Sequence, residues 1–203
     1  MIPKVTYMSS LVTYFIISAL TVASPGAAVV FTITNTLTKG PGTAIRGYIG
    51  VAIGILVVGY FSHEMLLRVD RHIPGGLGWV TLFGACYFLW LAAAKPHNKK
   101  VVLREKMARN HEMLSGVLIS VTNPKALLFF TSVYPLYLDE NIHFFLLIVI
   151  FAGNVIFIHS MYTLCFTTYK KRLSLNEENW QKITRLLYLF LSISCFVYAF
   201  KQM

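Results

Sequence analysis

Six long apolar segments constrain the fold of this chain more than any other feature. They cover approximately residues 7–37, 44–67, 77–94, 112–138, 142–168 and 183–200, with polar loops between them. An α-helix needs roughly 17–25 predominantly apolar residues to cross a bilayer, and every segment reaches that length. Only 13% of the 203 residues are charged, against about 25% in soluble domains. We expect an all-α integral membrane protein with a single transmembrane domain over residues 1–203.

Two of the six segments are interrupted. The fourth contains Asn123, Pro124 and Lys125. Pro124 lacks a backbone donor and clashes one turn back, so the helix must kink or break there. Lys125 lies roughly 20 Å from the start of this segment, and a charge at that depth costs about 3 kcal/mol or more. The first segment would span roughly 46 Å if straight, against a hydrocarbon core of about 30 Å, and Pro25-Gly26 is where we expect it to break.

The distribution of basic residues predicts the topology. The net charge is +10, but the basic residues cluster in loops between apolar segments, which indicates topology signals and contacts with anionic lipid rather than nucleic-acid binding. With six spans, most lysines and arginines fall on one side, above all in the loop 95–111. The positive-inside rule then places that loop in the cytoplasm and both termini outside.

Three spans in each half predict an inverted repeat. The halves, about 1–94 and 112–203, enter the membrane from opposite sides, and the broken helices, spans 1 and 4, are the first of each half. Interrupted helices at corresponding positions are a pointer to a transporter's binding site. We therefore expect a 3+3 inverted repeat with a site between these two spans.

Each break has two interpretations. Lys125 and the backbone freed at Asn123-Pro124 either line a cavity and hold a substrate carboxylate, or Lys125 pairs with a carbonyl or with Glu64 and locks the bundle. Pro25-Gly26 is either a second unwound segment facing the first or a simple kink.

The other polar residues within spans also leave alternatives open. Glu64 either carries a proton across a transport cycle or pairs with Arg68 one turn away. His159 either contacts the substrate or a coupled proton, or it only forms a hydrogen bond to a neighbouring helix. Asn35 and Asn154 likewise either contact the substrate or only join helices.

Several short motifs resemble one family. Residues 123–126 read Asn-Pro-Lys-Ala and are followed by Phe129 and Phe130; residues 24–27 read Ser-Pro-Gly-Ala, 84–89 read Gly-Ala-Cys-Tyr-Phe-Leu, and glycines recur at 47, 50 and 54. In order and spacing this resembles the LysE/RhtB family of small bacterial amino-acid exporters. The resemblance implies a secondary exporter of amino acids or similar small zwitterions in the bacterial cytoplasmic membrane, driven by the proton gradient.

The sequence departs from the family pattern at the first break. Ala27 replaces the second proline of the family's first motif, and Ala28 stands where many members carry a polar or acidic residue. Both departures concern the region expected to bind substrate, so a divergent specificity is consistent with the resemblance.

Other functions receive less support from the sequence. An exporter of metal or other small ions would need clustered His, Asp or Cys within the spans, and an intramembrane enzyme would need an acid-base motif, for which only His63-Glu64 is a candidate. No cofactor or metal site is implied.

Gly50 and Gly54 form a GxxxG pair suited to close helix contacts within one subunit or between the subunits of a homo-oligomer. Which amino acid is carried stays open.

Overall fold

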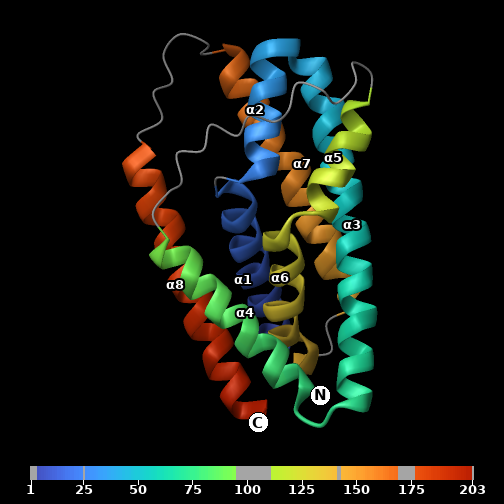
Figure 1. Ribbon diagram of the computed structural model, residues 1–203, viewed down its shortest axis with the longest axis vertical. Coiled ribbons are helices and arrows are strands. Elements are labelled where there is room, and N and C mark those ends of the chain that lie inside the picture. The colour runs from blue at the N-terminus through green and yellow to red at the C-terminus, as the bar shows by residue number, and fades with distance from the viewer. Residues whose placement is uncertain (1–3, 25, 95–110, 141–142, 169–176, 203) are drawn as a thin grey trace.

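The computed structural model describes residues 4–24, 26–94, 111–140, 143–168 and 177–202, which form helices and no strand in these ranges (Figure 1). The elements are α1 (Lys4–Ala23), α2 (Ala27–Lys39), α3 (Pro41–His72), α4 (Gly76–Ala93), α5 (Glu112–Val121), α6 (Pro124–Ser132), the 3-10 helix η1 (Tyr134–Glu140), α7 (Phe144–Thr168) and α8 (Glu177–Gln202). The prediction of an all-α fold is confirmed for this part of the chain.

The chain bends at both expected breaks. The bend between α1 and α2 is 58°, and the bend between α5 and the helical segment that begins at Pro124 is 49°. Gly26 precedes α2 in an extended conformation, without a side-chain cap. Pro25, expected to cause the first bend, lies outside the described residues.

By length and composition, α3, α4 and α7 can each cross a membrane, and there are up to five spans if each bent pair is one. An α-helical membrane protein is thus supported. The sixth predicted span falls on α8, which is helical but is not among these five candidates. The six-span inverted repeat therefore stays a prediction.

The helices pack as two groups. The long helix α3 packs mainly on α5 and α7 and also on α2, while α4 packs along α8. Figure 1 shows α3 along one edge of the molecule and α8 at the opposite edge, with α1 and α6 between them. Helix α1 begins and helix α8 ends at the same end of the bundle (Figure 1).

Glycines allow α3 and α5 to approach closely. A Cβ atom built on Gly50 would lie 1.9 Å from the Met113 carbonyl oxygen, and one on Gly116 would lie 2.1 Å from the Gly47 carbonyl oxygen. A side chain fits at neither position while the backbones stay in place. The α3 glycines, Gly54 among them, therefore serve a contact within one chain, and assembly into a homo-oligomer stays a prediction.

An aromatic cluster fills the core on the side of the chain termini. The buried ring of Tyr14 from α1 meets Phe129 of α6 at 6.0 Å and Tyr137 of η1 at 5.2 Å between ring centroids. Phe129 also meets Phe151 of α7 at 4.9 Å. The two contacts of Tyr14 are edge-on and that of Phe129 with Phe151 is tilted, and together they join three spans just beyond Lys125.

Candidate functional site

The two helix breaks face each other, and Lys125 joins them. Its ammonium donates to the carbonyl oxygens of Thr21 at 2.6 Å and Ser24 at 3.4 Å, and also to the Ser24 hydroxyl. Thr21 lies in the last turn of α1 and Ser24 directly follows it, where carbonyls lack helical partners and carry the negative end of the helix dipole. Of the alternatives that the sequence leaves open for Lys125, this structure shows the contact with carbonyls.

Asn123 and Pro124 explain why the lysine lies there. The Asn123 side chain accepts a hydrogen bond from the Lys125 backbone N–H at 3.1 Å and so caps α6. Pro124 is the first residue of that helix, where a missing N–H costs nothing. The cap and the proline together start a new helix at the break, with Lys125 in its first turn.

Tyr188 of α8 completes the surroundings of the ammonium. Its hydroxyl lies 3.3 Å from the Ser24 hydroxyl, and its ring centroid lies 5.8 Å from the Lys125 Nζ. A ring face at this distance attracts a cation. Since Tyr188 is only 5% exposed, α8 helps to shield the charge from lipid.

A cavity with a volume of about 40 Å³ opens beside the ammonium, which is space for a few water molecules. Its polar lining comes from Thr21, Ser24, Ser120, Asn123, Lys125 and His159, and most of the remaining wall is aliphatic or aromatic, from Val22, Val29, Val51, Ile55, Ala126, Phe151 and Val155. Gly26 and Ala28 contribute the wall next to the first break. No carboxylate is among the lining residues, so the described cavity carries an excess of positive charge.

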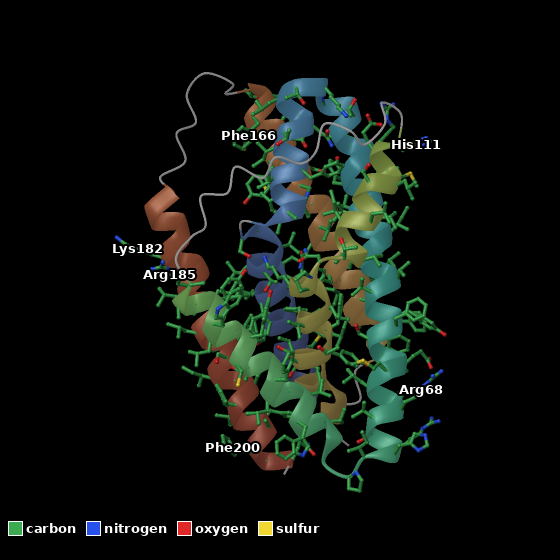
Figure 2. The ribbon with its side chains drawn as sticks, in the orientation of Figure 1. Arg68, His111, Phe166, Lys182, Arg185 and Phe200 are labelled. Carbon is green, nitrogen blue, oxygen red and sulfur yellow. The ribbon has the colours of Figure 1, made fainter. Side chains whose placement is uncertain are left out.

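Of the residues predicted for proton coupling, His159 lies in the cavity wall and Glu64 does not. The buried His159 ring shares a hydrogen bond with the Thr32 hydroxyl at 2.6 Å through Nδ1. Glu64 is partly exposed on α3. Among the residues that the structure describes, no basic side chain lies within ion-pair distance of it, and Arg68 points outward from α3, away from the bundle (Figure 2).

The two asparagines proposed as substrate contacts lie outside the cavity lining. Asn154 donates to the Phe15 carbonyl oxygen at 3.1 Å and to the Ser18 hydroxyl at 2.7 Å, so it joins α7 to α1. Asn35 is buried beside Gly47, and its amide nitrogen has no hydrogen-bond partner within the described ranges. The structure therefore brings Gly26, Asn123, Lys125 and His159 together, with Pro124 at the break.

Sequence reasoning missed the partners supplied by α1, α2 and α8. Thr21, Thr32 and Tyr188 stand in ordinary apolar stretches, and helical hydroxyl groups commonly bond their own helix. The only signal was positional, because Thr21 and Ser24 lie within one turn of the expected first break.

The cap can be tested by its effect on stability. Replacing Asn123 with alanine should lower the free energy of unfolding by about 1 kcal/mol, because the backbone N–H of Lys125 loses its acceptor. Thermal unfolding in detergent would measure this, and Asn123→Asp, which keeps a capping oxygen, should remain near wild type. Equal stability of the alanine variant would mean that Pro124 alone starts α6.

A multi-pass helical membrane protein with a lysine held between two broken helices belongs to the class of membrane translocators, and sequence comparison identifies the family. The profile of the LysE type translocator family matches residues 19–201, so the chain belongs to that family. Threonine efflux proteins of Salmonella typhi and of Salmonella typhimurium strain LT2 are each 26% identical over 133 residues. The match covers 59% of this chain and 62% of each relative, which is less than two thirds of the relatives' length. No solved structure matches the chain significantly.

Proposed function

We propose that this chain is a secondary exporter of small neutral amino acids in the bacterial cytoplasmic membrane. The observation that carries the proposal is the Lys125 ammonium beside a cavity between two broken helices, because a half-buried cation and freed backbone groups suit a substrate with charged ends. Family membership and the threonine efflux relatives support the same class of cargo.

The lining of the cavity favours a neutral side chain. An amino acid with a basic side chain brings a second cation, and the residues that line the cavity offer no carboxylate for it. The aliphatic wall suits a short apolar or hydroxylated side chain instead. L-Threonine, the cargo in the relatives' name, is therefore the first probe to use.

Alternating access is the transport mode that we propose, with the first and fourth spans around a common site. The packing supports an inverted repeat, because α3 packs on α5 and α6 as α7 packs on α1 and α2, while α4 packs on α8. Six crossings would put both termini on the same side of the membrane, and the basic loops on the other side favour the outside for them. In support, α1 begins and α8 ends at the same end of the bundle (Figure 1). The aromatic cluster of Tyr14, Phe129 and Tyr137 then separates the cavity from the outer face.

The test is efflux from proteoliposomes loaded with labelled L-threonine and, separately, with L-alanine, L-lysine and L-glutamate, with and without an imposed proton gradient. We expect efflux of the small neutral amino acids, faster with the gradient, over protein-free vesicles. Efflux of none of these amino acids would contradict the proposal. An exporter of metal or other small ions would be considered next, although no group of three or more His, Cys, Asp or Glu in the described part of the chain could hold a metal ion.

Proton coupling can be assigned by comparing two variants. His159 lines the cavity near Lys125, with Tyr48 and Tyr162 packed on its ring, whereas Glu64 lies outside the cavity lining. We propose that His159 carries the coupled proton. His159→Asn should keep efflux down a substrate gradient but lose most of its stimulation by the proton gradient, while Glu64→Gln should keep that stimulation. The reverse pattern in the same vesicle assay would assign coupling to Glu64.

A further inference from the structure

The end of α1 forms a cage of acceptors built for a primary ammonium group. The carbonyl oxygens of Thr21 and Ser24 and the hydroxyl of Ser24 receive hydrogen bonds from the Lys125 Nζ. An ammonium has three N–H donors, and the cage offers three acceptors. Nothing in this geometry depends on the rest of a lysine side chain, so any group of the form R–NH₃⁺ that reaches the cage meets the same acceptors.

One further oxygen at the cage lacks a partner. The Thr21 hydroxyl is buried, lines the cavity and forms no hydrogen bond with any residue that the structure describes. Other threonines here, Thr36 in α2 and Thr122 at the C-cap of α5 for example, donate to the carbonyl four residues earlier at 2.8 and 2.7 Å. A buried hydroxyl without a partner is costly, so this oxygen is available to a bound molecule.

The balance of charge indicates what that molecule is. A substrate carboxylate is attracted to Lys125, but once the Lys125 Nζ moves onto it the acceptors of α1 lose their cation. An amino acid carries a replacement of the same kind, since its α-ammonium has the same three donors. Every charged group then keeps a partner, which matters in a site of low dielectric, where an unpaired charge is strongly unfavourable.

Gly26 leaves the first break open beside the Lys125 ammonium. A Cβ atom built on Gly26 would lie 4.0 Å from the Lys125 Nζ and 3.9 Å from the Ser24 carbonyl oxygen, which is ordinary contact distance. The absence of a side chain at Gly26 therefore leaves space next to the ammonium on the cavity side.

We propose that the cage formed by Thr21 and Ser24 is the binding subsite for the substrate's α-ammonium, which displaces the Lys125 Nζ as Lys125 pairs with the substrate carboxylate. The proposal rests on the amino-acid export proposed above. It predicts that the site selects molecules with both charges: a hydroxy acid leaves the cage empty, and an amine without a carboxylate leaves Lys125 unpaired.

The cage can be tested apart from transport in the Lys125→Ala protein. Propylammonium has the four heavy atoms that this substitution removes. We expect 50 mM propylammonium chloride to raise the melting temperature of purified Lys125→Ala protein by a few degrees over 50 mM sodium chloride, and to leave wild type, whose cage is occupied, unchanged. Adding Ser24→Ala to the variant should remove most of the shift. No shift in Lys125→Ala protein would overturn the proposal, whatever the efflux assay gives.

The role of the cage toward substrate is tested by competition with labelled L-threonine efflux. Unlabelled L-threonine should compete at least tenfold better than 2,3-dihydroxybutyrate, which lacks the ammonium, and than 1-aminopropan-2-ol, which lacks the carboxylate. Equal competition by the hydroxy acid would overturn the subsite while leaving the exporter in place.

Thr21→Val should raise the threonine concentration needed for half-maximal efflux about tenfold, a loss of one acceptor worth about 1.4 kcal/mol. Thr13→Val, the same change on the same helix away from the cavity, should not.

Discussion

Export is expected to fall more than about a hundredfold when Lys125 is replaced with alanine, with the protein still inserted and folded. The substrate carboxylate would enter a cavity whose described lining then holds no lysine, arginine or carboxylate, and burying an unpaired charge costs several kcal/mol. The fold should lose less, about 1–3 kcal/mol, because Lys125 bonds uncharged oxygens there rather than a carboxylate. The Thr21 carbonyl oxygen still accepts from the Ser24 hydroxyl at 2.7 Å in the variant, so of the two carbonyls only that of Ser24 loses its acceptor role among the described contacts. Efflux of labelled L-threonine per amount of inserted protein measures the first effect, and thermal unfolding measures the second.

Two substitutions make this result specific. Lys39→Ala removes another lysine, one that is half-exposed and pairs with Glu112 at 3.6 Å across α2 and α5, and it should export normally because surface pairs contribute little. Lys125→Arg keeps the charge, but its planar guanidinium group cannot donate to the three acceptors of α1 as an ammonium does. We therefore expect Lys125→Arg protein to export little more than Lys125→Ala protein. Normal export by inserted Lys125→Ala protein would mean that the lysine only locks α6 to α1.

The breaks and the central residues were predictable because each breaks a rule that apolar helices otherwise obey. A proline inside a span must disturb the helix, and a lysine there must have a partner. Asn123, Pro124 and Lys125 can therefore be recognised from the sequence alone as candidates for the site. The helix bounds followed from apolar length, and errors stayed at the ends: α3 extends to Pro41 and His72 around the predicted 44–67. Pro41 fits there as the first helical residue.

The direction in which a polar residue faces was not predictable. Asn154 and His159 lie five residues apart on α7, which separates them by roughly 7.5 Å along the helix and turns their side chains well apart. In the structure Asn154 bonds Ser18 while His159 lines the cavity. Both read as polar residues in an apolar span. The partners of Lys125 were hidden for a related reason: Thr21 lies 104 residues away, and only packing brings it close.

The largest effect on stability is expected at Gly116, where alanine should lower the free energy of unfolding by about 3 kcal/mol or more. The added Cβ would lie 2.1 Å from the Gly47 carbonyl oxygen and 2.8 Å from the Val51 backbone nitrogen. Both atoms belong to the backbone of α3, which α2 and α7 also hold in place, so α5 has to move away. That movement would strain the hydrogen bond from the Ser120 hydroxyl to the Val51 carbonyl oxygen, now 2.9 Å.

Gly153→Ala is the matched control for this change, since it makes the same substitution inside a helix at a position where a Cβ meets no atom within 4 Å. Alanine is the better helix former by about 1 kcal/mol, so Gly153→Ala should be as stable as wild type or slightly more stable, and the same intrinsic gain applies at Gly116. The difference in melting temperature between the two variants therefore measures the close contact of α3 and α5 alone. Equal melting temperatures would mean that α5 shifts away from α3 at little cost, and the α3–α5 pair would then become a place where the two halves can move during transport.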